Sequence, residues 1–288
     1  MPSSPTNRRS TRITSASALA LTLALGAGLA AVPLSLAGTA GAATASAKAE
    51  VSSNGREMSY TAAAGQTNKA TVTESNANAT DITFVVDDVV PISVGRGCVY
   101  PSAADHTKVA CTVVTEESQS PYQIMRMYLG NGNDVVDFTN KSNETYLTTA
   151  FILGAGKDKL TARGDVGGNF VDGEAGDDTI LGGNSLLTAG GDGNDTLTSS
   201  NGTAQGGKGN DVIRGTAGAE DLRGDDGNDT IYGGAGNDHI SGDKGNDVLY
   251  GNAGVDYIWG NSGNDKLYGG AGRDVLSGGP GTDVVRQD

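Results

Sequence analysis

A nine-residue period runs without interruption from Gly206 to Arg286 and constrains the fold more than any other feature of the chain. Glycine holds the first and fourth places of every unit, an acidic residue the sixth, and a branched aliphatic residue the eighth. Four of the units read GGKGNDVIR, GDDGNDTIY, GGAGNDHIS and GDKGNDVLY. Such a period is typical of solenoids, because one short unit can bury its apolar face only against neighbouring units.

The pattern within one unit predicts a turn over places one to six and a short strand over places seven to nine. Glycines at places one and four allow positive φ and close backbone approach. The aliphatic side chain at place eight faces a core, whereas places seven and nine face outward. Two units make one coil, so strands two units apart lie side by side. The sequence therefore predicts an all-β fold, a right-handed parallel β-roll (β-solenoid) of nonapeptide repeats.

Stacked coils bring the sixth-place carboxylates together along two edges, because coils rise by about 4.8 Å each. One edge carries Asp211, Asp229, Asp247, Asp265 and Asp283, and the other carries Glu220, Asp238, Asp256 and Asp274. Unscreened carboxylates at such spacing repel each other. Ca²⁺ accepts 6–8 oxygen ligands at about 2.3–2.6 Å, whereas Mg²⁺ demands a tight octahedron and keeps its waters. We therefore expect several calcium ions between successive turns.

The units resemble the calcium-binding nonapeptide repeats of RTX (haemolysin-type) proteins, closely over 206–286 and loosely over 130–198. The resemblance implies that sixth-place aspartates are side-chain ligands and that glycine-turn carbonyls complete each site. The implied carboxylate ligands are Asp134, Asp158, Asp178, Asp195, Asp211, Asp229, Asp238, Asp247, Asp256, Asp265, Asp274 and Asp283. The implied carbonyl ligands are those of Gly206, Gly224, Gly233, Gly242, Gly251, Gly260 and Gly269. The alternative is a glycine-rich solenoid whose aspartates only cap turns, but a capping role would also tolerate Asn or Ser.

Less regular repeats occupy residues 129–205. Asp134 lies in GNGNDVVDF, Asp158 in GAGKDKLTA, Asp178 in GEAGDDTIL and Asp195 in GGDGNDTLT. In GDVGGNFVD the sixth place is Asn169, which keeps an oxygen but loses the charge. We expect a continuous solenoid whose early coils bind calcium unevenly, with a weak or empty site at Asn169.

The amino-terminal segment, 1–47, has the pattern of a secretory signal peptide. Three arginines precede an apolar run from Ala16 to Ala31, and small residues end at Ala47, the predicted cleavage point. The residues after the Arg8-Arg9 pair favour the general secretory route over twin-arginine export. A retained membrane anchor is the alternative, although two glycines and a proline weaken a spanning helix. We therefore predict a secreted, extracellular protein of bacterial type.

Charge excludes some partners. The chain has 20 basic and 34 acidic residues, for a net charge of −14. Removal of 1–47 removes three arginines and no acid, so the remainder carries 17 − 34 = −17. Nucleic acid and anionic membrane surfaces are poor partners for such a chain.

Residues 48–128 have a different composition, with less glycine and several alternating β-rich runs. These runs are Glu57–Thr61, Ala70–Glu74, Asp81–Asp87, Lys108–Thr115 and Tyr122–Leu129. The only two cysteines, Cys98 and Cys111, predict a disulfide in an exported protein. Zinc is disfavoured because only His106 is nearby. The segment is either a small disulfide-bonded β domain before the roll or the first irregular coils of the solenoid.

No catalytic motif stands out. The chain has no HExxH and no GxSxG sequence, and its two histidines, His106 and His239, are far apart. We expect a non-enzymatic calcium-binding protein with a structural or surface-interaction role, whose partners are calcium ions and a cell-surface glycan or protein. The alternative is a toxin- or hydrolase-like effector, including a solenoid enzyme acting on polysaccharide, with the repeats as its calcium-dependent folding module.

The outward-facing residues at place nine of each unit also form a pattern. Place nine gives Arg214, Tyr232, Tyr250, Tyr268 and Arg286 on one sheet, and Arg223, Ser241, Trp259 and Ser277 on the other. The tyrosines are expected to stack as an outward ladder. Either the ladder only stabilises the sheet through cross-strand packing, or it forms a strip that binds sugar or a partner.

Overall fold

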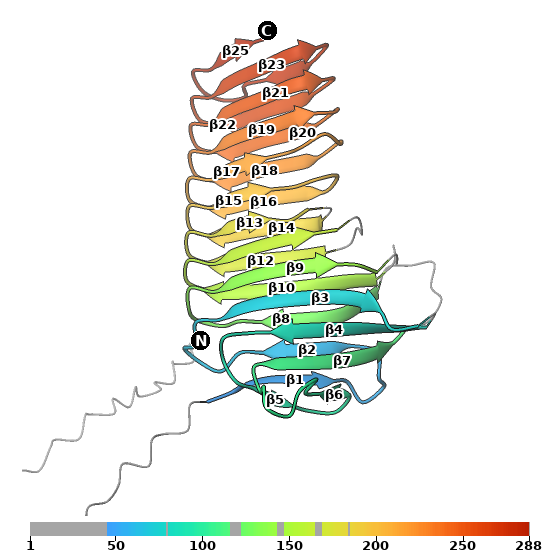
Figure 1. The fold of residues 1–288 in the computed structure, drawn as a ribbon. Helices are drawn as coiled ribbons and strands as arrows, with labels where there is room; N and C mark the ends of the chain where they lie inside the picture. Colours follow the sequence, from blue (N-terminus) through green and yellow to red (C-terminus); the bar gives the residue numbers. More distant parts are fainter. Residues whose placement is uncertain are drawn as a thin grey trace, which may run out of the picture. The chain divides into compact units, whose positions relative to one another are not determined.

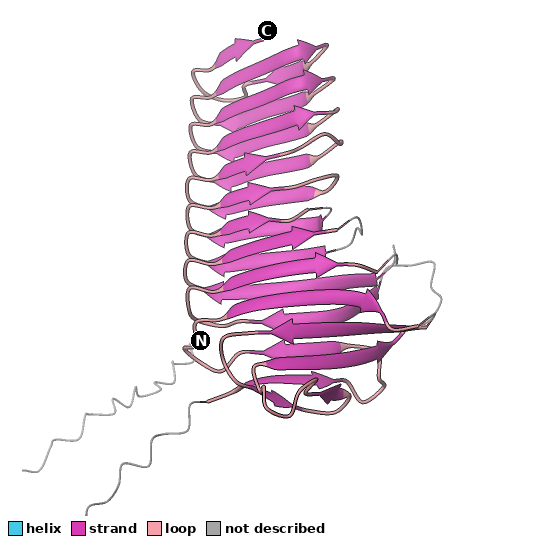
Figure 2. Cartoon of the chain, in the orientation of Figure 1, coloured by secondary structure: helices cyan, strands magenta, loops and turns pink. Residues whose placement is uncertain are grey.

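The computed structural model describes residues 45–78, 80–115, 122–142, 147–164, 169–183 and 185–287. The predicted signal peptide, apart from its last three residues, lies outside the described residues. Every helix or strand position in the described ranges is taken by a β-strand, and these ranges contain no helix (Figure 2). Within those ranges there is accordingly no helix long and apolar enough to cross a membrane.

The strands form two sheets, which we call sheet A and sheet B. Each coil of the roll contributes one strand to each sheet (Figure 1). Sheet A runs in the order β24 (Val275–Ser277), β22 (Tyr257–Ser262), β20 (His239–Lys244), β18 (Asp221–Asp226), β16 (Thr203–Lys208), β14 (Ser185–Asp192), β12 (Asn169–Ala175), β10 (Leu147–Ala155), β8 (Tyr122–Tyr128), β2 (Met58–Thr61), β1 (Ala47–Val51), β5 (Ile92–Val94). Sheet B runs in the order β25 (Val284–Arg286), β23 (Lys266–Gly272), β21 (Val248–Gly254), β19 (Thr230–Ala235), β17 (Val212–Arg214), β15 (Thr196–Thr198), β13 (Thr179–Leu181), β11 (Lys159–Arg163), β9 (Val135–Asn140), β3 (Lys69–Asn76), β4 (Asp81–Asp87), β7 (Lys108–Val114), β6 (Cys98–Val99).

Strand pairing in the roll is parallel and follows the predicted two-unit coil. Ile213 of β17 pairs with Ile231 of β19, 18 residues later. The earlier coils vary in length: Leu197 pairs with Ile213, 16 residues later, and Val136 pairs with Leu160, 24 residues later. The repeat region is a β-solenoid of about seven turns, so the predicted fold class is confirmed.

Most strands of the contiguous repeats are longer than predicted, although β17, β24 and β25 span three residues as expected. We expected three residues at places seven to nine, but β18 and β20 each span six, places seven to nine followed by places one to three. The turn is therefore only places four to six, such as Gly227-Asn228-Asp229 between β18 and β19. The glycine-rich sequence at places one to three suggested a turn, but pairing with the equivalent residues of neighbouring coils makes it part of the strand.

The interior of the roll is a thin line of aliphatic side chains, as predicted for place eight. Ile213, Leu222, Ile231 and Ile240 are all fully buried, and the same holds for the equivalent residues up to Leu267. Each contributes roughly 1.5–3 kcal/mol when fully buried. This core is small for the number of residues it orders.

The amino-terminal β part, residues 47–128, extends both sheets and is continuous with the roll. Strand β2 pairs with β8, and β3 pairs with β9, in both cases parallel. Antiparallel pairs then join β3 to β4 and β4 to β7. Of the runs predicted here, Asp81–Asp87 matches β4 and the other four match their strands to within two residues, while β1, β5 and β6 were not predicted. Strand β1 begins at Ala47, which is fully buried, so the predicted cleavage point falls at the start of a core strand.

The core of this part is bulkier than that of the roll. Tyr60 and Phe84 are fully buried, together with methionines such as Met58 and Met125. Cys98 and Cys111 form a disulfide across the β6–β7 pair, as predicted. Aromatic packing and the crosslink give this part the means to fold through side-chain packing.

Candidate metal centre

The turns of the contiguous repeats depend on two glycine positions with different roles. Place four has positive φ in every unit except those of Gly218 and Gly272, for example 154° at Gly227, where a β carbon would lie 1.5 Å from the carbonyl oxygen of Gly209. Place one does not have positive φ, contrary to our expectation; the second left-handed position is place two, with φ of 70° at Asp225. Glycine is instead needed at place one because a β carbon on Gly224 would lie 2.2 Å from Asp229 Oδ2.

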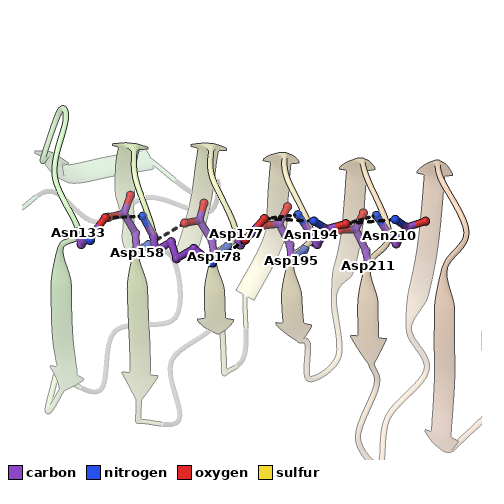
Figure 3. Close-up of polar contacts among 9 residues, drawn as sticks. Asn133, Asp158, Asp177, Asp178, Asn194, Asp195, Asn210 and Asp211 are labelled. Atoms are coloured by element: carbon purple, nitrogen blue, oxygen red, sulfur yellow. Dashed lines mark hydrogen bonds and ion pairs between the residues drawn. The ribbon is translucent and has the colours of Figure 1, made fainter.

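The sixth-place aspartates form a buried ladder along the edge where the chain passes from sheet A to sheet B, which we call the first edge (Figure 3). Each Oδ1 accepts a hydrogen bond from the backbone N–H of the equivalent residue one coil earlier. Asp229 Oδ1 accepts from Asp211 at 2.7 Å, and Asp247 Oδ1 accepts from Asp229 at 2.8 Å. The ladder continues through Asp265 to Asp283, and in the other direction through Asp195, Asp178, Asp158 and Asp134 to the backbone of Asn68.

The second carboxylate oxygen of each rung has no partner in the protein. The Oδ2 atoms of Asp211, Asp229, Asp247 and Asp265 are buried and accept no hydrogen bond, and the same holds for those of Asp134, Asp158, Asp178 and Asp195. A buried carboxylate oxygen without a partner is unfavourable. A repeating row of them indicates that another group binds there.

Carbonyl oxygens converge on the same space. The position of a β carbon on Gly224 would lie 2.2 Å from Asp229 Oδ2 and 2.8 Å from the carbonyl oxygen of Gly242, one coil later. The place-one glycines also fall outside the pairing of β18 with β20, which passes from Arg223↔Ser241 to Asp226↔Lys244. A carboxylate oxygen and a backbone carbonyl oxygen therefore face a space between successive coils, which is the oxygen-only donor set that suits Ca²⁺.

The other edge, where the chain passes from sheet B to sheet A, carries a shorter ladder that includes Glu220. Asp238 Oδ1 accepts from the backbone of Glu220 at 3.0 Å, and Asp256 Oδ1 accepts from Asp238 at 2.9 Å. The additional methylene of Glu220 shifts its carboxylate by one residue relative to the other rungs, because Asp221 pairs with Thr203 and the position equivalent to Glu220 one coil earlier is Gly202. Its Oε1 accepts from the backbone of Asn201 at 2.8 Å, and its buried Oε2 has no partner. Glu220 therefore belongs to the candidate ligand set.

The predicted ligands thus separate into two groups by edge. Asp134, Asp158, Asp178 and Asp195 of the early repeats all lie on the first edge. The early second edge has Asn169 instead, buried, with its Oδ1 accepting a hydrogen bond from Thr149 Oγ1 at 2.5 Å. Because that oxygen already has a partner, Asn169 differs from the unpaired rungs.

A second, exposed ladder was not predicted. On the first edge the place-five side chains Asn194, Asn210, Asn228 and Asn246 each accept, through Oδ1, from the backbone N–H of the next coil at 2.8–2.9 Å (Figure 3). The recurrent Gly-Asn-Asp triplet in the sequence was the available signal. This ladder fixes the spacing of successive turns from outside, so that the carboxylates within stay in register.

Burial raises the pKa of the first-edge carboxylates from Asp134 to Asp265. Desolvation raises the pKa of Asp229 to about 7, with Asp211 and Asp247 adding repulsion and the Asp211 N–H opposing it. The pKa of Asp178 is also raised to about 7, and those of Asp211 and Asp247 to about 6, in each case chiefly by burial. Ionised at neutral pH, these groups destabilise the metal-free roll, and a cation removes that cost.

Lower pH is therefore expected to stabilise the calcium-free roll. In the unfolded chain these carboxyls have a pKa near 3.9, so between that value and about 7 the folded form binds more protons and gains stability as pH falls. We expect protein dialysed free of calcium to melt at a higher temperature at pH 5.5 than at pH 7.5. Protons compete with Ca²⁺ for the same oxygens, so the calcium-loaded protein should show the opposite trend. An unchanged or lower calcium-free melting temperature at pH 5.5 would contradict the buried ladder.

Each site would combine two neighbouring carboxylates with backbone oxygens. Among the described residues, His, Cys, Asp and Glu side chains do not converge in groups of three or more. This fits a shared ladder, in which each rung has one rung before it and one after it, rather than an all-side-chain cage. Backbone carbonyls such as that of Gly242 would supply the remaining protein ligands.

Comparison with known families gives one match. A family model described as RTX calcium-binding nonapeptide repeat (4 copies) matches residues 154–185, 189–203, 198–231, 214–249 and 250–285. The matched range includes the contiguous repeats and part of the early repeats, and it excludes the amino-terminal β part. No curated protein matches the chain.

Proposed function

We propose that this chain, which carries RTX calcium-binding nonapeptide repeats across residues 154–285, is a secreted, non-enzymatic protein whose roll is folded and stabilised by Ca²⁺ bound between coils. The observation that carries the proposal is the row of buried carboxylate oxygens without partners, most of which have a backbone carbonyl oxygen beside them in the contiguous repeats. Bound calcium would neutralise the stacked charges. Export is supported by the predicted signal peptide and because RTX repeat proteins are typically secreted.

The geometry sets the expected number of ions. The first edge of 206–286 provides four rung pairs, from Asp211–Asp229 to Asp265–Asp283, and the second provides three, from Glu220–Asp238 to Asp256–Asp274. We expect about seven ions there and further ions on the first edge of the early repeats. Calcium per protein, measured by elemental analysis after gel filtration, tests this.

The variant Glu220→Ala provides the matched test of the revised ligand set. It should remove one ion, because Glu220 has a rung on one side only. Two or fewer ions bound to the whole protein at saturating calcium would refute the proposed function.

The proposed role is structural or surface-interacting. A stack of coils held by ions presents two broad outer sheet faces, and their side chains can vary without affecting the buried ladders.

A further inference from the structure

The outward place-nine rows of the two sheets differ in how completely they are filled. On sheet B the rings of Tyr232, Tyr250 and Tyr268 stack with centroids 5.0 and 4.9 Å apart, as predicted. Arg214 and Arg286 lie over the terminal rings at 5.2 and 5.9 Å. These aromatic faces are covered by one another and by the arginines. This row therefore stabilises the sheet, and its rings are not available to stack on a sugar.

On sheet A the same row is interrupted. Ser241 pairs with Arg223 on one side and with Trp259 on the other, and Trp259 pairs next with Ser277. A hollow of about 490 Å³ lies over Ser241, lined by Arg223 and Trp259 among others. Trp259, the only tryptophan of the chain, is 37% exposed.

The hollow has the width of one six-membered ring. Arg223 and Trp259 are two strand spacings apart, about 9.6 Å at the backbone. A flat ring at the Ser241 rung would lie about 4.8 Å from each neighbour. That spacing matches the 4.9 and 5.0 Å at which the tyrosine rings stack on sheet B.

The rim of the hollow offers hydrogen-bond donors and acceptors. Asn261 Nδ2 donates to Ser241 Oγ at 2.7 Å and to Asp243 Oδ1 at 3.2 Å, and these contacts orient the amide. Arg223 donates to Asp221 through Nε at 3.3 Å and through Nη2 at 3.4 Å, which leaves the Nη1 N–H groups for a ligand. Two carboxylates and one guanidinium give the rim a negative balance, which disfavours phosphate or carboxylate ligands.

Aromatic rings hold Trp259 in place. The His239 ring lies edge-on to it, with centroids 6.1 Å apart, and the Tyr257 ring lies beside it at 6.1 Å. Both neighbours are on the outer face of sheet A, so the tryptophan is part of a small aromatic cluster. An aromatic wall beside convergent polar groups is the usual composition of a small-ligand site.

We propose that the hollow between Arg223 and Trp259 binds one pyranose ring of a neutral saccharide. The C–H face of the sugar would pack on Trp259, and its hydroxyl groups would pair with Asp221, Asp243 and Asn261 at the rim. A purely apolar ring, such as a phenylalanine side chain, would leave these polar groups unpaired. The proposal rests on the proposed function in one respect: the hollow spans three coils, so it exists only when calcium has folded the roll.

The single tryptophan makes the test specific to this site. Calcium-loaded full chain is titrated with maltohexaose, mannohexaose and chitohexaose, and Trp259 fluorescence is recorded. We expect at least one of these to change the emission saturably, with a dissociation constant on the order of 1 mM for a ligand held through one ring. Circular dichroism of the same samples verifies that the roll is folded, so a failure of the proposed function is seen separately.

Matched variants locate the site on one side of the tryptophan. Ser241→Tyr would fill the hollow as Tyr250 fills its rung on sheet B, and should weaken saccharide binding at least tenfold while the protein stays folded. Ser277→Tyr, on the opposite side of Trp259, and Tyr250→Ser, on sheet B, should leave binding within twofold of the parent.

Three results would overturn the proposal. The first is unchanged Trp259 emission with all three saccharides in folded, calcium-loaded protein. The second is undiminished binding by Ser241→Tyr. The third is preferential binding of anionic trigalacturonate or of N-acetyl-tyrosinamide, which would assign the hollow to acidic sugars or to protein side chains instead.

Discussion

Removal of calcium is expected to destabilise the contiguous repeats strongly, so that they exchange and melt well before the amino-terminal β part. In the repeats the core is about one aliphatic side chain per unit, and the ladder carboxylates carry unpaired buried oxygens. Ions that bind only the folded form add about 1.4 kcal/mol per site at a calcium concentration tenfold above the dissociation constant. Seven such sites would add on the order of 10 kcal/mol, which is comparable with the whole stability of a typical domain.

Hydrogen exchange read by mass spectrometry measures this region by region. In excess chelator we expect amides of 206–286 to exchange rapidly and those of β2, β3, β4 and β7 to stay protected. Their protection comes from the aromatic core around Tyr60 and Phe84 and from the disulfide. Added Ca²⁺ should restore protection cooperatively at about 10⁻⁴–10⁻³ M, the range of extracellular calcium modules.

Magnesium supplies the control for charge screening alone. Mg²⁺ keeps several waters and fits carbonyl-rich sites poorly, so at equal concentration it should restore much less protection. Full protection of 206–286 in chelator would mean that packing alone holds the roll and that calcium is incidental to folding.

The two-unit coil, the two acidic edges and the buried place-eight line could be predicted because the period forces them. Once Gly206 and Gly224 are equivalent, Asp211 and Asp229 must be stacked, and their hydrogen bond at 2.7 Å agrees. The tyrosine ladder follows from the same arithmetic. Short-range patterns sufficed because each coil contacts only its neighbours.

Features that depend on long-range pairing could not be predicted in the same way. Places one to three look like a turn by composition, and only pairing between coils makes them strand. The joining of β2 to β8 and of β3 to β9 leaves no periodic trace, so the continuity of the amino-terminal part with the roll was undecided. Glu220 was not among the implied ligands because the resemblance gives aspartate at the sixth place, and only the structure shows that its carboxylate reaches the backbone N–H of Asn201.

Substitution of a central rung should affect two sites, and substitution of the terminal rung only one. Asp247 accepts from the backbone of Asp229 and donates its own N–H to Asp265 Oδ1 at 2.9 Å. Asp247→Ala should therefore cost two ions and leave the Asp229 N–H without a partner, for a loss of about 4–6 kcal/mol in calcium. Asp283 has a described rung on one side only and its Oδ1 accepts from the Asp265 N–H, so Asp283→Ala should cost one ion and about 2–4 kcal/mol. Calorimetric stoichiometry and urea unfolding measure both; equal losses would show that ions are not shared between neighbouring turns.

The variant Asp247→Asn separates ion binding from the hydrogen-bond ladder. Asparagine keeps the Oδ1 that accepts from Asp229 but removes the buried charge, and the pKa of Asp247, raised to about 6, indicates how costly that charge is without a cation. In chelator Asp247→Asn should therefore stabilise the roll, by an amount on the order of 2–3 kcal/mol. In calcium it should destabilise the roll, because two sites lose a ligand. The sign of the effect thus reverses with calcium, whereas an aspartate that only caps a turn would give the same sign in both conditions. Unfolding of parent and variant in matched chelator and calcium buffers decides between these roles.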